Sequence, residues 1–292
     1  MMPRLLARLL APVAITGLVA CATGPTSLEI DRSITATGQN SRVEFIVLHY
    51  TDSATPRSLQ LLSRGEVSAH YLVTDGNPPR VYQLVDENRR AWHAGVSQWR
   101  GRTWLNASSI GIEIVHEPFR PGAASNDPGR WKPYPAAQID TVIQLVRDVA
   151  QRHEVKPENI VGHSDVAPQR KQDPGPAFPW QRLAAEGLGR WYDPSAVAAW
   201  RAQLALRPLP AIAWYQARLA EVGYEVPQHG VLDTATRAAL RAFQMHWRPE
   251  LAEGDPDAGT AAVLLGVLGA DPARPDEGLR EAAGPTEKPA QR

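Results

Sequence analysis

The sequence predicts an α/β or α+β domain that extends to about residue 205, followed by a small all-α domain. Short apolar runs with the lengths of buried strands are interspersed with helical patterns in the first two thirds of the chain. The break Arg207-Pro208-Leu209-Pro210 then reads as a linker. Three short helical patterns follow it, which is the number that a small bundle needs.

The predicted strands come in a fixed order along the first domain. Val43 to His49 is an almost continuous apolar run, which is typical of a buried strand. Ala69 to Val73 and Val81 to Val85 are two further strands, separated by the turn residues Asp75-Gly76-Asn77-Pro78-Pro79. Ile110 to Val115 alternates apolar and polar residues and predicts a fourth strand, and Ile160-Val161 is a short apolar stub.

Two helices are predicted among these strands. Ser58 to Ser63 is rich in leucine and predicts a short helix. Ala136 to His153 places apolar residues three and four positions apart, so it predicts an amphipathic helix. Pro118 to Pro135, rich in Pro, Gly, Asn and Asp, predicts a long surface loop before it.

The second domain is predicted from helix start and stop signals. Ile212 to Gly223 is a helix that ends at its glycine. The next helix runs from Asp233 to Trp247, with Asp233 or Thr234 as its N-cap. Thr260 to Leu268 is the third helix, and the Pro-, Ala- and charge-rich stretch from Ala270 predicts a disordered tail.

The N-terminus has the pattern of a secretory signal. Arg4 and Arg8 precede an uncharged apolar run that is too short to span a bilayer comfortably. Leu18-Val19-Ala20-Cys21 then resembles the lipobox of bacterial lipoproteins, in which the cysteine becomes the lipidated first residue. The alternative is ordinary signal cleavage beside an incidental cysteine. We expect a periplasmic protein anchored through Cys21, in the outer membrane because Ala22 rather than Asp follows the cysteine.

Composition narrows the class of partners. The 31 basic and 31 acidic residues balance and form no polybasic run, so nothing points to nucleic acid. Cys21 is the only cysteine, which excludes an intramolecular disulfide. The predicted division of the chain is a signal peptide at 1–20, a tether at 21–41, an α/β or α+β domain at 42–206, a helical domain at 207–269 and a tail at 270–292.

The segment 162–175 carries the most chemistry. Its glycines and prolines disfavour a helix and predict an ordered loop, which holds His163, Lys171 and Asp173. Imidazole and carboxylate are zinc ligands, and an ammonium group can stabilise an oxyanion. This loop therefore reads either as half of a metal-hydrolase site or as a polar surface loop.

Two residues from separate strands can complete such a site. A hydrolytic zinc needs three protein ligands, and His49 stands at the end of a buried strand, although a histidine there is more often structural. Glu113 lies inside the apolar strand Ile110 to Val115, where burial would raise its pKa and suit it to proton transfer. The alternatives are a satisfied buried glutamate or an exposed strand face.

The chain resembles the zinc-dependent N-acetylmuramoyl-L-alanine amidases of type 2, which are related to peptidoglycan-recognition proteins. The segments that carry the resemblance are Ile46-Val47-Leu48-His49-Tyr50-Thr51, Ser68-Ala69-His70-Tyr71-Leu72-Val73, Ala91-Trp92-His93-Ala94-Gly95, Asn106 with Ser109-Ile110-Gly111-Ile112-Glu113, and Gly162-His163-Ser164-Asp165 through Lys171-Gln172-Asp173-Pro174-Gly175. The segments Leu219 to Tyr224, Gly230 to Asp233 and Ala242 to Gln244 resemble a three-helix peptidoglycan-binding module.

The resemblance implies a fold, an activity and roles for particular residues. It implies a mixed sheet flanked by helices, and hydrolysis of the amide bond between N-acetylmuramic acid and L-alanine of a peptidoglycan stem. The sequence leaves open whether the 1,6-anhydro form is a substrate as well. The implied zinc ligands are His49, His163 and Asp173, not Asp165. Glu113 would activate water, Lys171 would steady the oxyanion, and Trp92, His93 and Asn106 would line the groove. We expect a monomer that binds muropeptides.

Two other functions fit parts of the sequence. A non-catalytic wall-binding receptor on the same fold typically lacks a metal ligand, whereas all three candidates are present here. A muramidase needs paired carboxylates, for which Glu113 and Glu117 are the nearest pair, and that interpretation leaves the histidines unexplained. The sequence therefore favours the zinc amidase.

Overall fold

The computed structural model describes residues 28–124 and 127–280 and divides the chain into two units, 1–39 and 40–292. The described part of the first unit, 28–39, contains neither helix nor strand. The predicted signal peptide and Cys21 lie outside the described residues. Among the residues described, no helix is both long and apolar enough to cross a membrane.

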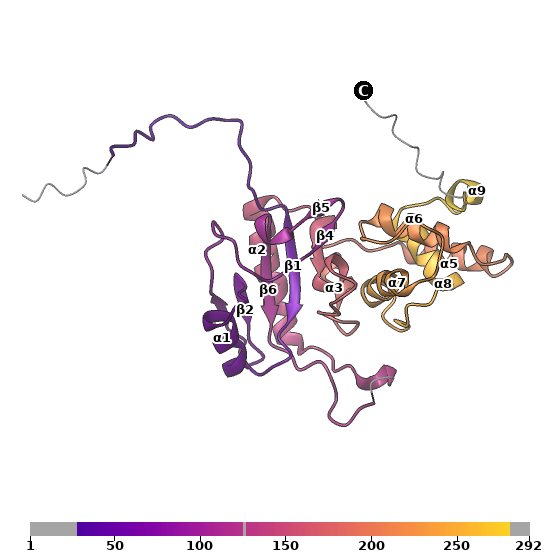
Figure 1. Ribbon diagram of the computed structural model, residues 1–292, viewed down its shortest axis with the longest axis horizontal. Helices are drawn as coiled ribbons and strands as arrows, with labels where there is room; N and C mark the ends of the chain where they lie inside the picture. Colours follow the sequence, from indigo (N-terminus) through magenta and orange to yellow (C-terminus); the bar gives the residue numbers. More distant parts are fainter. Residues whose placement is uncertain (1–27, 125–126, 281–292) are drawn as a thin grey trace, which may run out of the picture. The chain divides into compact units, whose positions relative to one another are not determined.

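A five-stranded mixed sheet forms the centre of the second unit (Figure 1). Its strands are β1 (Phe45–Tyr50), β2 (Tyr71–Val73), β3 (Val81–Gln83), β6 (Ser109–Ile114) and β7 (Ile160–Gly162), in the order β3-β2-β6-β1-β7. The β1 strand is parallel to β6 and β7, β2 is parallel to β6, and only β3 is antiparallel. The predicted mixed sheet and the positions of its strands are confirmed.

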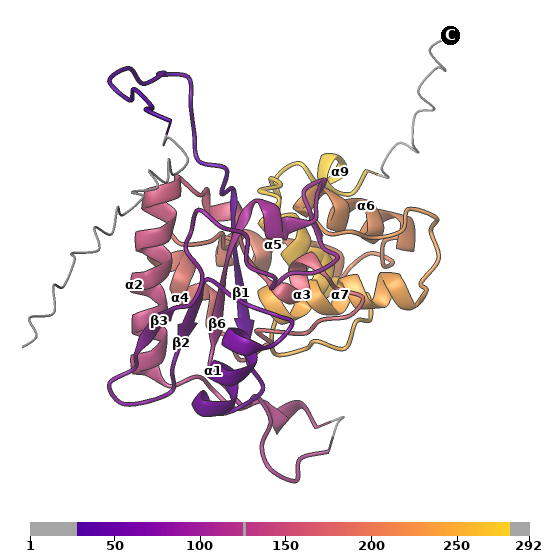
Figure 2. The ribbon, with the colours of Figure 1, turned by 60° about the vertical axis from the view of Figure 1, so that its left-hand side comes forward.

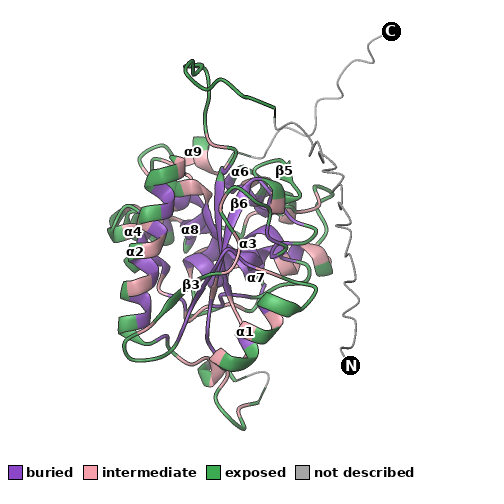
Figure 3. Cartoon of the chain, turned by 90° about the vertical axis from the view of Figure 1, so that its left-hand side faces the viewer, coloured by how far each residue is buried: buried purple, intermediate pink, exposed green. Residues whose placement is uncertain are grey.

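The two faces of the sheet bury different cores. Ile46 and Leu48 of β1 pack in one apolar cluster with α2 (Ala136–His153), the predicted amphipathic helix. Phe45 and Val47 point to the other face and share a cluster with the C-terminal helices. Figure 2 shows α2 on one side of the sheet and α5, α7 and α9 on the other, and Figure 3 shows in purple that the central strands are buried.

Several short elements surround the sheet. They are α1 (Thr55–Arg64), β4 (Gln98–Trp99), β5 (Arg102–Thr103), α3 (His163–Val166), α4 (Trp180–Ala185) and the 3-10 turns η1 (Leu105–Ala107), η2 (Pro128–Arg130) and η3 (Pro157–Asn159). The prediction of a loop throughout 162–175 is wrong at α3. Gly162 and Pro168 flank this single helical turn instead of interrupting it, so the four residues between them can coil.

The C-terminal region contains the three predicted helices and two others. The predicted ones are α6 (Ile212–Val222), α7 (Thr234–Trp247) and α8 (Ala258–Val267). Asp233 caps α7 by accepting a hydrogen bond from the Thr236 amide, and α6 ends at Gly223, whose φ of 141° suits glycine. The further helices are α5 (Pro194–Leu204) and α9 (Pro275–Gly278).

The edges of this helical region differ from the sequence-based expectation. Trp200 of α5 is fully buried in one cluster with residues of α8, so α5 packs with the helical domain although it precedes the predicted boundary at 206. The Trp200 and Trp214 indole N–H groups donate to the carbonyl oxygens of Ala270 and Gly278. A disordered tail is therefore wrong for 270–280, while 281–292 lie outside the described residues.

One partly buried ion cluster around Glu87 predicts how the stability of the fold depends on pH. Burial alone would raise the pKa of Glu87, but hydrogen bonds from Arg152, Tyr71 and His153 outweigh it and lower this pKa to about 2. A lowered carboxylate pKa stabilises the fold above the ordinary value, and this stabilisation is lost as the pH falls through the folded value.

We therefore expect Glu87→Gln to lower the free energy of unfolding by about 1–2 kcal/mol at pH 7, with solvent screening taken into account. In urea titrations at several pH values, the difference from wild type should shrink as the pH falls from 4.5 towards about 2. A difference that stays constant over this range would show that the lost stability does not come from the Glu87 charge.

Candidate metal centre

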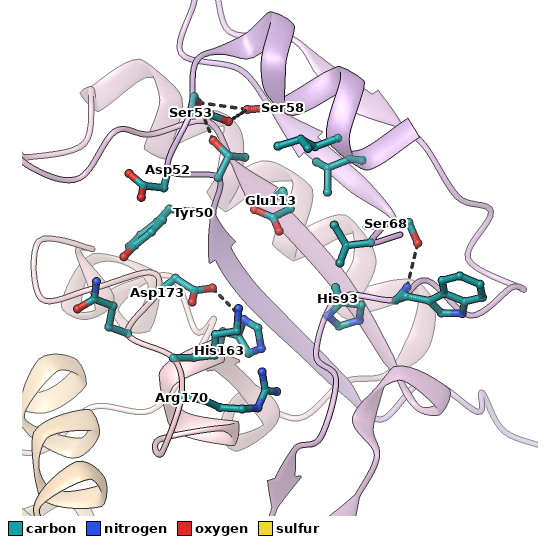
Figure 4. A pocket seen from close by; sticks show the side chains of 17 residues that line it. Tyr50, Asp52, Ser53, Ser58, Ser68, His93, Glu113, His163, Arg170 and Asp173 are labelled. Carbon is teal, nitrogen blue, oxygen red and sulfur yellow. Dashed lines mark hydrogen bonds and ion pairs between the residues drawn. The ribbon is translucent and has the colours of Figure 1, made fainter. Parts of the chain in front are cut away.

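A cavity of about 360 Å³ opens at the carboxyl ends of β1 and β6. His49 ends the buried part of β1 and pairs in register with Glu113 of β6, so both side chains lie on the same face of the sheet. His163 begins α3, and Asp173 follows on the same loop. Figure 4 shows His163 and Asp173 converging on one point, with Glu113 across the cavity.

Three ligand atoms meet at this point. The Nδ1 atoms of His49 and His163 lie 2.9 Å apart, and each lies 3.0 Å from Oδ2 of Asp173. All three side chains are buried, and together they form a group that can hold a metal ion. The structure thus brings together the three residues that the sequence predicted as ligands.

The hydrogen bond at the far side of the His163 ring determines which nitrogen carries its proton. Its Nε2 atom lies 3.2 Å from the Ala94 carbonyl oxygen, which only accepts, so Nε2 carries the hydrogen. In the neutral form of the ring, Nδ1 then carries a lone pair that faces the Asp173 carboxylate. A lone pair against a carboxylate oxygen repels unless a cation lies between them, so the donor set fits a metal ion.

A chain of hydrogen bonds from Ser109 through His93, which we call the Ser109 relay, determines in the same way which nitrogen of His49 carries the proton. The Ser109 hydroxyl donates to the Leu105 carbonyl oxygen over 2.6 Å, so its oxygen accepts from Nε2 of His93 at 3.1 Å. His93 is then left with an acceptor at Nδ1, which lies 3.0 Å from Nε2 of His49. His49 therefore donates from Nε2, and its Nδ1 lone pair points to the metal position.

The relay depends on a glycine. The His93 ring packs directly over Gly111, where an added Cβ would lie only 2.3 Å from a ring carbon. His93 was predicted to line the groove; it lines the cavity and also supports His49 from behind. Sequence reasoning missed Ser109, although its small polar side chain inside an apolar strand was a usable signal.

The ionisation states agree with a cation site. Burial, and then repulsion by His163, lower the pKa of His49 to about 4, so this imidazole is neutral near pH 7. Burial alone would raise the pKa of Asp173, but the two histidines outweigh it and hold that pKa well below its usual range. The site therefore offers two imidazoles, of which that of His49 is neutral near pH 7, and one carboxylate, which is a set that zinc accepts.

Glu113 has the environment of a proton acceptor. Burial, and then the nearby Asp173 carboxylate, raise its pKa well above the ordinary value, while Lys171 lowers it. Its Oε2 atom is buried and has no hydrogen-bond partner among residues 28–124 and 127–280. This carboxylate is therefore free to exchange a proton with a molecule in the cavity.

The remaining predicted site residues lie in different places. Lys171 is exposed and lines the cavity, and Trp92 lies at its edge with 56% of its surface exposed. Asn106 does not line the cavity, which corrects its predicted position. Its Oδ1 accepts hydrogen bonds from the amides of His93 and Ala94, so it braces the loop behind the cavity.

Asp165, which the resemblance leaves out of the ligand set, contacts the helical domain instead. Its Oδ1 accepts a 2.6 Å hydrogen bond from the Tyr224 hydroxyl, and its Oδ2 lies 2.7 Å from Nδ1 of His246. The His246 ring stacks on Trp180 with centroids 3.9 Å apart. Asp165 thus joins the segment 162–175, the candidate metal-binding loop, to the helical domain.

Comparisons with known proteins agree with this geometry. Residues 39–176 match the family model described as N-acetylmuramoyl-L-alanine amidase, and residues 209–264 match a putative peptidoglycan binding domain. The N-acetylmuramoyl-L-alanine amidase AmiD of Escherichia coli K12 is 40% identical over 245 residues, which cover 82% of this chain and 87% of that relative.

Two solved structures are similar over most of their length. AmpDh3 from Pseudomonas aeruginosa is 40% identical and has a TM-score of 0.74, with coverage of 82% of this chain and 97% of the other. AmiD from E. coli, in complex with the substrate anhydro-N-acetylmuramic acid-L-Ala-D-gamma-Glu-L-Lys, is 39% identical and has a TM-score of 0.73. That match covers 84% of this chain and 96% of the other. The chain therefore belongs to the N-acetylmuramoyl-L-alanine amidase family.

Proposed function

We propose that this protein uses zinc to hydrolyse the amide bond between the lactyl group of N-acetylmuramic acid and L-alanine of the peptidoglycan stem peptide. The observation that carries the proposal is the convergence of two imidazole lone pairs and one carboxylate oxygen beside Glu113 and Lys171. In this proposal, His49, His163 and Asp173 are the zinc ligands.

The chain's own groups can carry the proton transfers. When bound, zinc polarises the amide carbonyl and lowers the pKa of water towards ~7. The raised pKa of Glu113 suits it to accept a proton from the attacking water and then to donate it to the departing alanine nitrogen. The Lys171 ammonium lines the same cavity and can stabilise the oxyanion that forms at the carbonyl oxygen.

The substrate is inferred from the relatives. The AmiD structure contains an anhydro-N-acetylmuramic acid peptide, and an AmpDh3 structure contains an anhydromuramic pentapeptide. We infer that this chain accepts 1,6-anhydro-muropeptides as well. Trp92, exposed at the edge of the cavity, offers an apolar face of the kind that packs against a sugar ring.

One experiment separates this function from its alternatives. The purified protein is incubated with muropeptides, with and without a chelator, and the products are identified by mass spectrometry. Release of the free stem peptide, abolished by the chelator and restored by zinc, is the expected result. No cleavage would indicate a non-catalytic receptor, and new reducing sugar ends that form despite the chelator would indicate a muramidase.

The Ser109 relay predicts a measurable effect on zinc affinity. Ser109→Ala removes the acceptor that keeps the His93 proton on Nε2. The proton can then move to Nδ1 of His93, and this nitrogen no longer accepts a hydrogen bond from His49. We expect zinc affinity, measured by competition with a chromophoric chelator, to fall about tenfold, and Ser109→Thr to retain it. Equal affinity in wild type and Ser109→Ala would show that the relay does not set the His49 tautomer.

The cellular location is proposed in two steps. An amidase that acts on peptidoglycan works in the periplasm or at the cell wall, and the match at 209–264 to a putative peptidoglycan binding domain supports this. We propose that a lipid on Cys21 anchors the protein to the outer membrane, on the basis of Leu18-Val19-Ala20-Cys21 and Ala22. We also propose that the protein is a monomer.

A further inference from the structure

A second groove begins where the catalytic cavity ends. It has a volume of about 480 Å³ and lies between the metal-binding loop and α7; we call it the α7 groove. Its lining residues are Pro168, Gln169, Arg170, Lys171, Gln172, Thr234, Arg237, Ala238, Arg241 and Met245. Three of them, Arg170, Lys171 and Gln172, also line the catalytic cavity, so a bound molecule can extend from one into the other.

The α7 groove is strongly cationic. Four of its lining residues are Arg or Lys, and none is Asp or Glu. Arg170 and Arg241 donate only to neutral carbonyl oxygens, those of Ala94, Val96 and Glu253. Among the described residues, neither of these arginines nor Lys171 forms an ion pair.

The remaining cation is partly compensated. Arg237 pairs with Asp255, which is mostly exposed and does not line the groove. The groove therefore presents three cations without a carboxylate partner and one with a partner at its rim. Like charges held this close repel one another, and an anionic ligand would relieve that repulsion.

The position of the groove is fixed by a buried contact. Tyr224 and His246 of the helical domain hold Asp165, two residues after His163. The α3 helix and α7 are in contact, and Figure 2 shows them side by side. The wall that α7 contributes is thus held at a set distance from the reacting bond, as a specificity site requires.

The chemistry of a stem peptide matches this groove. The peptide in the AmiD complex contains a γ-linked glutamate, which retains a free α-carboxylate, and ends at a lysine. Guanidinium groups bind carboxylates through paired, charge-assisted hydrogen bonds. We propose that the α7 groove binds the free carboxylates of the stem peptide, so that the helical domain takes part in recognising the substrate.

This inference rests on the proposed function, and the test keeps the two apart. Two muramyl-L-Ala-D-γ-Glu-L-Lys substrates are compared, one with free carboxylates and one with both carboxylates converted to amides. Wild type is expected to have a KM about tenfold lower for the free acid, which is the effect of one charge-assisted hydrogen bond. High salt should reduce this preference because it screens the groove.

Arg241→Glu tests the groove and Arg207→Glu is its matched control. Arg207 is exposed and lines neither this groove nor the catalytic cavity. Arg241→Glu should abolish the preference for the free acid while kcat for the amidated substrate stays unchanged. Arg207→Glu should behave as wild type. Arg241→Gln, which removes the charge without reversing it, should show an intermediate KM and serves if Arg241→Glu does not fold.

The outcomes distinguish the two hypotheses. An unchanged preference in Arg241→Glu, or an equal loss with both substrates, would overturn the carboxylate site. If wild type cleaves neither substrate, the proposed function fails instead. In that case, calorimetric binding of the free-acid peptide to wild type and Arg241→Glu still tests the groove, because binding does not require turnover.

Discussion

Glu113→Ala and Glu113→Gln are expected to lower kcat on a muropeptide by about 10²–10⁴-fold while zinc content remains that of wild type. Among the carboxylates that line the cavity, Glu113 is the one whose pKa is raised most clearly. It does not belong to the group of three residues that could hold the metal ion. Removing it therefore takes away a proton acceptor and leaves the proposed zinc ligands in place. Stopped-time assays by mass spectrometry and metal analysis measure both quantities.

If Glu113 is the base, its raised pKa also predicts the direction in which activity changes with pH. A base must be deprotonated to act, so activity should rise as the pH increases through the raised pKa of Glu113 and fall below it. Wild-type kcat/KM should show this acid limb, and the residual activity of Glu113→Gln should lack it. The result is clearest if thermal unfolding confirms that the variant is folded.

Glu117→Gln is the matched control. Glu117 is exposed on the segment after β6 and does not line the catalytic cavity. It should retain wild-type activity as an amidase, whereas a muramidase that used a Glu113–Glu117 pair would lose activity in both variants. Loss of zinc in Glu113→Gln would instead assign Glu113 to metal binding and contradict its role as a base.

Local sequence together with the resemblance singles out His49, His163 and Asp173, but neither predicts the geometry that brings them together. Strand alternation places His49 and Glu113 on particular faces of β1 and β6, and nothing local states that these strands pair with His49 opposite Glu113. That register is fixed by the packing of both sheet faces. Asp173 was chosen over Asp165 from the resemblance alone, and the structure supplies the physical reason, because Asp165 is occupied by Tyr224 and His246.

Other features of the fold have weaker signals in the sequence. Asp193 followed by Pro194 is a helix start signal, and Asp193 does cap α5, but its alanine-rich sequence lacks a clear amphipathic pattern. The two-residue strands β4 and β5 are too short to show any alternation. Asn106 was placed in the groove by resemblance, while its actual partners are two backbone amides that no sequence pattern identifies.

His163→Ala is expected to reduce zinc affinity by at least about 100-fold, because losing a ligand costs more than losing a group that orients one. Wild type should contain zinc after purification, lose activity with a chelator and regain it when zinc is added. His163→Ala should contain little zinc and show no activity at zinc concentrations that saturate wild type.

His229→Ala is the matched control for His163→Ala, because it removes a histidine that lies outside the proposed ligand set. His229 belongs to the helical region, where it pairs with Asp233 and is 47% exposed, so its removal should leave zinc content and activity unchanged. Zinc should also raise the melting temperature of wild type and of His229→Ala but not that of His163→Ala, because only a protein that binds the metal in its folded state is stabilised by it. Full zinc occupancy in His163→Ala would remove this residue from the ligand set. The metal position would then have to be held by His49 and Asp173 with a third ligand from elsewhere, and His93, which contacts His49, would be the residue to test next.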